Sequence, residues 1–173
     1  MATVLRAGTG MTRLLHVAAG AAQPRAWTRP FVARLRELGE LEIVEYAAML
    51  SDDEVAARIR NCDVLITSWG SRMTPATLAT DPGDLRYICH LTGGMRDFIP
   101  LEMIDSGLPV TNWGNAQARA VAEGAVLLLL ASLKGLRQRT DHIAAGQWRP
   151  SETEFRSSMM FDLPLGIYGY GFI

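Results

Sequence analysis

The chain has 173 residues, a length that suits one domain or one domain with part of a second. Hydrophobic residues make up 49% of it and charged residues 20%, so it can bury a sizeable core. With a formal net charge of −1, nothing in the composition argues for a nucleic-acid partner, which usually needs a basic face.

Two cysteines and one apolar run indicate the cellular location of the protein. Cys62 and Cys89 lie in or beside apolar runs, form no CxxC pair and have no histidine at metal-ligand spacing, which predicts buried free thiols and no metal site. The uncharged run at 124–133 is too short to cross a bilayer. We therefore expect a soluble, cytoplasmic protein with no membrane partner.

The N-terminal region admits two interpretations. Arg6 and Arg13 precede a short apolar run, which is a weak likeness to a signal peptide. The alternative is that residues 12–18 form the first strand of the domain, and His16 within the run favours this. Residues 1–10 are then expected to be an unstructured leader, with Met11 as a possible true start.

Apolar runs and helical periodicity alternate after this first strand. In chain order the sequence predicts a helix at 27–39, a strand at 41–46, a helix at 51–61, a strand at 62–68, a helix at 73–80, a strand at 85–90, a helix at 100–107 and a strand at 108–112. Ser51 and Glu54 form a capping box at one helix start. Thr74 is the expected cap of another helix, with Pro75 at its first position.

The alternation predicts an α/β fold with a parallel sheet that is covered on both faces. Right-handed crossovers leave few topologies, of which we favour the flavodoxin-like strand order 2-1-3-4-5. Residues 1–112 are expected to form this first domain.

Residues 113–148 are predicted to form a bridging segment built on a long helix at 116–138, capped by Asn115. The middle of this helix is apolar nearly all round, so it needs a second domain or a second subunit against it. Glu123 within it is expected to pair with Arg119, one turn earlier.

The loop HLTGGMRDFIP follows the fourth predicted strand, at the end where open α/β sheets bind ligands. Gly93 and Gly94 expose backbone N–H groups that can hold a carboxylate, and Arg96 adds positive charge. An ordinary βα loop is the alternative. His16, His90 and His142 have no carboxylate at a telling spacing, so we expect them to be structural or exposed.

The last residues, LPLGIYGYGFI, contain Gly169 and Gly171 at the first two spacings of a GxGxxG dinucleotide fingerprint. LGIYG predicts a strand, the first of a Rossmann domain, and residues 149–173 are expected to begin that domain. The third glycine and the following helix are absent from the sequence. A glycine-rich tail without such a role is the alternative.

Taken in order, T-G-G-M-R-D-F-I-P, G-L-P-V-T-N, A-R-A-V-A-E and L-G-I-Y-G-Y-G-F-I resemble segments of the NAD-dependent D-isomer-specific 2-hydroxyacid dehydrogenases, which include phosphoglycerate dehydrogenases and glyoxylate reductases. The resemblance runs over residues 12–173. It implies a substrate domain, an inserted Rossmann domain that binds NAD or NADP, and a homodimer formed through helix 116–138.

The resemblance also assigns roles to residues. It places the substrate carboxylate on Gly93 and Gly94, with Met95 and Arg96 beside them, and the nicotinamide at Gly94. The start of the pyrophosphate turn then corresponds to four residues: Gly169, Gly171, Phe172 and Ile173.

Two departures from the family pattern matter. The family loop reads G-x-G-x-D-N, whereas Met95 and Phe98 stand at its second glycine and its asparagine. The family's catalytic arginine, glutamate and histidine lie downstream of Ile173, so no catalytic residue is present in this chain. We expect a sequence truncated within the fingerprint and inactive alone.

The expected parent enzyme transfers a hydride between NAD(P) and a small 2-hydroxy or 2-oxo acid. A non-enzymatic α/β module is the alternative function. Such a module would dimerise through helix 116–138, or would bind a small anion at Gly93 and Gly94.

Overall fold

The computed structural model describes residues 10–22, 27–148, 158–169 and 171. The chain divides into two compact units, and the division falls after Gly114. Each unit is described by itself below.

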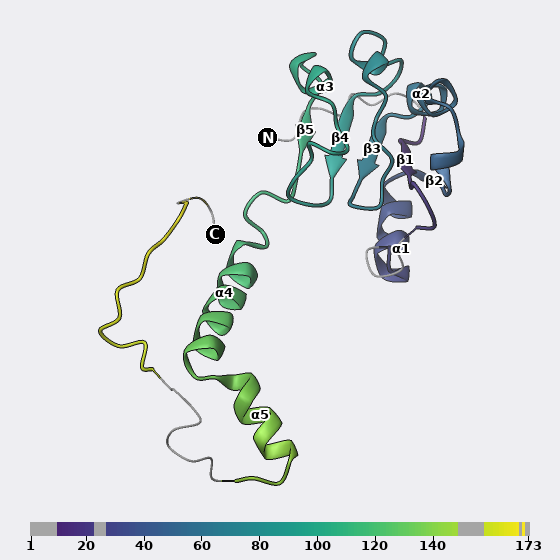
Figure 1. The fold of residues 1–173 in the computed structure, drawn as a ribbon. Helices are drawn as coiled ribbons and strands as arrows, with labels where there is room; N and C mark the ends of the chain where they lie inside the picture. Colours follow the sequence, from purple (N-terminus) through teal and green to yellow (C-terminus); the bar gives the residue numbers. More distant parts are fainter. Residues whose placement is uncertain (1–9, 23–26, 149–157, 170, 172–173) are drawn as a thin grey trace. The chain divides into compact units, whose positions relative to one another are not determined.

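The first unit is built on a five-stranded sheet in which every pairing is parallel. Its strands are β1 (Arg13–Val17), β2 (Glu40–Val44), β3 (Val64–Thr67), β4 (Tyr87–His90) and β5 (Val110–Thr111). Figure 1 shows them side by side in the order β2-β1-β3-β4-β5. The predicted α/β class and the strand order 2-1-3-4-5 are therefore confirmed.

Helices cover both faces of this sheet, because successive side chains of each strand point to opposite faces. On one face, α1 (Arg29–Leu38) packs Phe31, Val32 and Leu35 around Leu14 and Ile66. The other face is covered by α2 (Asp52–Arg60), α3 (Leu101–Asp105) and the 3₁₀ turns η1 (Ala47–Met49) and η2 (Ala76–Ala79).

The capping box at α2 is present as predicted. The Ser51 hydroxyl accepts from the Glu54 backbone N–H at 3.3 Å, and the Glu54 carboxylate accepts from the Ser51 backbone N–H at 2.7 Å. These two bonds satisfy N–H groups that a helix start would otherwise leave unpaired.

The prediction for 73–80 is partly wrong. The segment is a 3₁₀ turn whose N-cap is Pro75, and Thr74 makes no cap. The Thr74 backbone N–H instead donates to the carbonyl of Phe98 at 2.9 Å, and its buried hydroxyl has no hydrogen-bond partner among the described residues. The contact with the later loop has overridden the local capping preference.

The single long helix predicted at 116–138 is also wrong. The second unit contains α4 (Ala118–Leu133) and α5 (Leu136–Ala144), which are separated at Gly135 with φ +57°. The N-cap of α4 is Gln117 and not the predicted Asn115. The backbone carbonyl of Asn115 accepts a hydrogen bond from the N–H of Ala118 at the start of this helix.

Helix α4 fully buries none of its side chains in the described structure, and five of its large apolar residues are exposed: Val121, Val126, Leu127, Leu128 and Leu130. Arg119 and Glu123 are exposed and form no ion pair with each other there.

Between 158 and 169 no residue lies in a helix or strand, so the strand predicted for LGIYG does not form. A strand needs a neighbouring strand for its backbone groups, and the described residues of the second unit contain no strand.

Two smaller predictions concern cysteines and membranes. Cys62 is buried and Cys89 half-buried, and both are free thiols, as expected. Burial raises the pKa of the Cys62 thiol to about 12, which disfavours the reactive thiolate. Within the described ranges, no helix has the length and apolar character needed to cross a membrane.

Candidate functional site

The candidate site lies at the carboxyl ends of β3, β4 and β5. Because neighbouring strands are parallel, Thr67, His90 and Thr111 end at the same edge of the sheet. The loop 91–100 leaves β4 at this edge, between the loops that follow β3 and β5. The four residues that the sequence predicted for substrate binding, Gly93, Gly94, Met95 and Arg96, are consecutive in this loop.

The loop presents unpaired backbone N–H groups. Among the described residues, no acceptor takes the N–H of Gly93, Gly94 or Met95. Gly94 is exposed, while Gly93 and Met95 are half-buried. Successive free N–H groups of this kind can bind an anion.

The carbonyl groups of the same three residues are all occupied. The Gly93 carbonyl accepts from the side-chain amide of Asn112 at 2.7 Å, and the Met95 carbonyl accepts from Phe98 and Ile99 N–H, each at 2.9 Å. The Gly94 carbonyl lies 3.0 Å from Nε2 of His90. The loop is therefore held through its acceptors while its donors remain available.

His90 is the buried anchor of this loop. Its Nδ1 lies 2.8 Å from the hydroxyl of Thr67, and its Nε2 lies 2.5 Å from the hydroxyl of Thr92. Since a carbonyl can only accept, the contact with Gly94 assigns the proton to Nε2, and the Thr67 hydroxyl then donates to Nδ1. Sequence reasoning expected His90 to be structural or exposed and did not identify its contact with Gly94.

Burial keeps His90 neutral. Desolvation lowers the pKa of its imidazole from the ordinary value of 6.5, and the hydrogen bond to Gly94 opposes this shift. The ring also stacks on Phe98, with centroids 5.4 Å apart. A neutral ring with both nitrogens engaged is suited to positioning the loop.

Two tryptophans flank the loop, and sequence reasoning did not assign either to the site. The indole of Trp113 lies against Gly93, so close that a Cβ added at 93 would be 2.6 Å from Nε1. Trp69, directly after the buried part of β3, packs edge-on against Trp113 with ring centroids 5.7 Å apart. The signal for Trp69 was a large aromatic residue just past the end of a buried strand.

Arg96 is the cation of this loop. Its side chain is exposed, and it forms no ion pair with any residue that the structure describes. Its charge is therefore available to an anion at the loop.

Among the residues that the structure describes, no carboxylate pairs with His16 or His90. Nδ1 of His16 donates to the carbonyl of Ile66 at 2.8 Å, and its ring packs on Trp27 with centroids 4.1 Å apart. These two histidines therefore lack the partner that a general base needs. No group of three or more potential metal ligands occurs in the described part of the chain.

Of the predicted cofactor residues, Gly94 lies in the glycine loop of the first unit and the others lie in the second unit. Gly169 has φ +92°, a conformation that favours glycine. Phe172 and Ile173 are outside the described residues. Around Gly169 the described chain has no strand and no helix N-terminus to hold a pyrophosphate. We therefore derive no chemistry through a cofactor, and this assignment stays a prediction.

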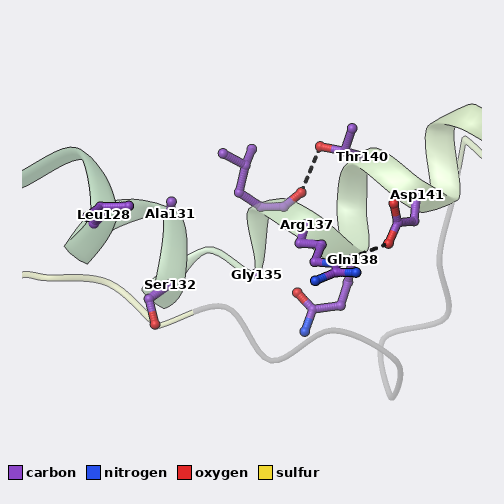
Figure 2. Close-up of a pocket in the computed structure, with 9 residues that line it drawn as sticks. Leu128, Ala131, Ser132, Gly135, Arg137, Gln138, Thr140 and Asp141 are labelled. Carbon is purple, nitrogen blue, oxygen red and sulfur yellow. Dashed lines mark hydrogen bonds and ion pairs between the residues drawn. The ribbon is translucent and has the colours of Figure 1, made fainter. Parts of the chain in front are cut away.

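The second unit also contains a shallow hollow of about 580 Å³ between α4 and α5 (Figure 2). Within it, the hydroxyl of Thr140 donates to the carbonyl of Leu136 at 2.8 Å. Arg137 and Asp141 form an ion pair at 3.9 Å. Its lining includes none of the residues that the sequence predicted for a site.

Comparison with known proteins identifies the family. The model of the D-isomer specific 2-hydroxyacid dehydrogenase catalytic domain matches residues 26–162. The chain is 27% identical over 138 residues to D-3-phosphoglycerate dehydrogenase of Methanocaldococcus jannaschii, an alignment that covers 79% of this chain and 25% of the relative. It is 24% identical over 145 residues to glyoxylate reductase of Thermococcus onnurineus, an alignment that covers 81% of this chain and 43% of the relative.

A third relative is 4-methyl-2-oxopentanoate reductase A of Aspergillus oryzae, 30% identical over 126 residues, with 65% of this chain and 38% of the relative covered. Among solved structures, an NADPH-dependent glyoxylate/hydroxypyruvate reductase from Sinorhizobium meliloti in complex with citrate matches with TM-score 0.59 and 25% identity, over 80% of this chain and 39% of that one. A Pyrococcus horikoshii protein matches in fold with TM-score 0.60 and 22% identity, over 83% and 40%.

The chain thus spans between 25% and 43% of the length of these curated relatives. The family model covers most of its residues, and the expected strand order is present. The chain belongs to the D-isomer specific 2-hydroxyacid dehydrogenase family.

Proposed function

We propose that the chain supplies the acid-binding part of an oxidoreductase that moves a hydride between NAD(P) and C2 of a 2-hydroxy or 2-oxo acid. The observation that carries this proposal is the set of free N–H groups at Gly93, Gly94 and Met95, at the carboxyl end of β4. Hydrogen bonds from N–H groups to a carboxylate are charge-assisted and stronger than neutral ones. Arg96 adds the complementary charge.

The first unit offers groups that can bind an acid, but its buried histidines are not arranged for proton transfer. His16 and His90 have no carboxylate partner, so neither can act as a base oriented by an acid. We therefore assign to this chain the binding and orientation of the acid, and not the proton transfer. The chain alone is then expected to oxidise neither NADH nor NADPH in the presence of glyoxylate. Measurable turnover by the pure chain would contradict this part of the proposal.

Acid binding is tested by calorimetric titration of the chain with glyoxylate at low ionic strength. Arg96→Gln should weaken the affinity by about two- to fivefold, since it removes one exposed charge near the carboxylate. Arg36→Gln is the matched control, because it makes the same charge change at an exposed position of α1. Binding that is absent, or equally affected by both variants, would overturn the proposal.

We further propose that a second copy of the chain covers α4, giving a homodimer. The support is the row of exposed apolar side chains on this helix, with Leu127 63% and Leu128 71% exposed. Light scattering should give a dimer mass that Leu128→Glu reduces to that of a monomer. A monomer mass for the unmodified chain at all concentrations would contradict this. A dimer without acid binding would favour the non-enzymatic module.

A further inference from the structure

The loops after β3 and β5 each carry a tryptophan at the sheet edge that holds the glycine loop. We call Trp69 and Trp113 the indole pair. Trp69 is 62% exposed, although a tryptophan ordinarily buries most of its large apolar surface. Trp113 is half-buried against Gly93. The pair therefore forms an aromatic surface that begins at the glycine loop and extends away from it.

Trp69 is exposed on a loop that is firmly held. The backbone N–H of Ser68 donates to the hydroxyl of Ser71 at 2.8 Å, and the N–H of Ser71 donates to the carbonyl of Ser68 at 3.0 Å. The carbonyl of Gly70 accepts from Ala19 N–H at 2.8 Å, next to β1. A large apolar group held in place by its neighbours is suited to binding, because little freedom is lost when a ligand covers it.

The surroundings of the indole pair combine two chemistries. Gly93, Gly94 and Met95 offer free N–H groups, and Arg96 offers charge, to a carboxylate. The adjacent indoles offer area to an apolar group and a favourable edge or face to an aromatic ring. A ligand that satisfies both is an amphiphilic acid, with a carboxylate at one end and an apolar group at the other.

We propose that the indole pair binds the C2 side chain of the acid, so that the substrate class is 2-oxo or 2-hydroxy acids with a large apolar or aromatic side chain. This inference rests on the proposed function, because the loop fixes the carboxylate from which the side chain extends. Acids without a side chain, such as glyoxylate, bind through the loop alone and gain nothing from Trp69.

The test compares phenylpyruvate with glyoxylate by calorimetric titration of the chain. Phenylpyruvate should bind about tenfold more tightly, and Trp69→Ala should remove about fivefold of that affinity while leaving glyoxylate unchanged. Trp69→Phe keeps an aromatic ring and should retain most of the preference. Trp148→Ala is the matched control, because Trp148 is 81% exposed in the other unit. Circular dichroism of each variant confirms that it is folded.

The possible outcomes distinguish a failure of this inference from a failure of the proposed function. Glyoxylate binding with no preference for phenylpyruvate would overturn the inference and leave the proposed function standing. A preference that survives Trp69→Ala, or that Trp148→Ala removes equally, would also overturn the inference. If neither acid binds, both the inference and the proposed function are wrong.

Discussion

At the scale of single residues, the two adjacent glycines of the loop have different surroundings. A Cβ at Gly93 would meet the indole of Trp113 at 2.6 Å, whereas a Cβ at Gly94 would meet nothing within 4 Å. Gly93→Ala should therefore lower the free energy of unfolding by about 1 to 3 kcal/mol, because the indole or the loop must move. Gly94→Ala should change it by less than about 0.5 kcal/mol.

Urea unfolding of both variants measures this difference. The double variant Gly93→Ala/Trp113→Ala should recover part of the loss, because the clashing ring is gone. Equal stability of the two single variants would contradict the packing described at Gly93.

His16 gives stability a pH dependence. Burial lowers its pKa in the folded state below the ordinary 6.5, against the opposing hydrogen bond to Ile66. The unfolded chain therefore binds more protons than the folded one once the pH falls below about 6.5, so stability is full above this pH and decreases below it. Burial lowers the pKa of His90 too, and its contribution has the same sign.

This prediction is checked by the free energy of unfolding measured at several pH values between about 7.5 and 5.5. His16→Asn retains a side-chain N–H for the Ile66 carbonyl and should reduce the slope. The lowered pKa values of Glu54 and Asp63 act only at more acidic pH. Stability that stays constant or rises on acidification to pH 5.5 would contradict the account.

At the scale of elements, replacing glycine by alanine should have opposite effects on the stability of the second unit at positions 124 and 135. Gly124 lies inside α4, where an added Cβ meets nothing, while Gly135 separates α4 from α5 with φ +57°. Gly124→Ala should stabilise the unit by up to about 1 kcal/mol, because alanine favours the helix. Gly135→Ala should destabilise it by about 1 to 2 kcal/mol, because L-residues disfavour the left-handed conformation.

Far-UV circular dichroism during thermal unfolding distinguishes the two variants. Helix loss should shift to higher temperature for Gly124→Ala and to lower temperature for Gly135→Ala. A rise in helix content for Gly135→Ala would show instead that the two helices fuse into one, and would contradict the break described at Gly135.

Elements were predictable where local and tertiary preferences agree. The strands of the first unit follow from apolar runs, of which those in β1 and β3 are largely buried, and the start of α2 follows from Ser51 and Glu54. The prediction failed at Thr74, where a contact with Phe98 decides the conformation. It failed again at Gly135, because nothing in the apolar pattern of the helix signals a left-handed residue.

The candidate site was predictable only in part. Adjacent glycines after a buried strand indicate Gly93 and Gly94 directly. The anchoring of Gly94 by His90, and the indole pair beside Gly93, depend on how three strands end at one edge. Side chains from 67, 69, 90 and 113 meet there only after the sheet forms, so spacing along the chain does not reveal them.

At the scale of the whole molecule, the two units have different character. The first contains a core on both faces of its sheet, while α4 fully buries no side chain and leaves five large apolar residues exposed. The structure divides into its two compact units after Gly114. The domain boundaries at 112 and 148 that the sequence suggests stay predictions. The proposed function belongs to the first unit and its glycine loop.

The measurement that tests this account most directly is an NMR titration of the chain with glyoxylate, read at the backbone amides. The account predicts that the signals of Gly93, Gly94 and Met95 shift most and with one common affinity, because their N–H groups bind the carboxylate. No shift at these amides, or shifts confined to Ser132 and Gln138 at the hollow between α4 and α5, would contradict it.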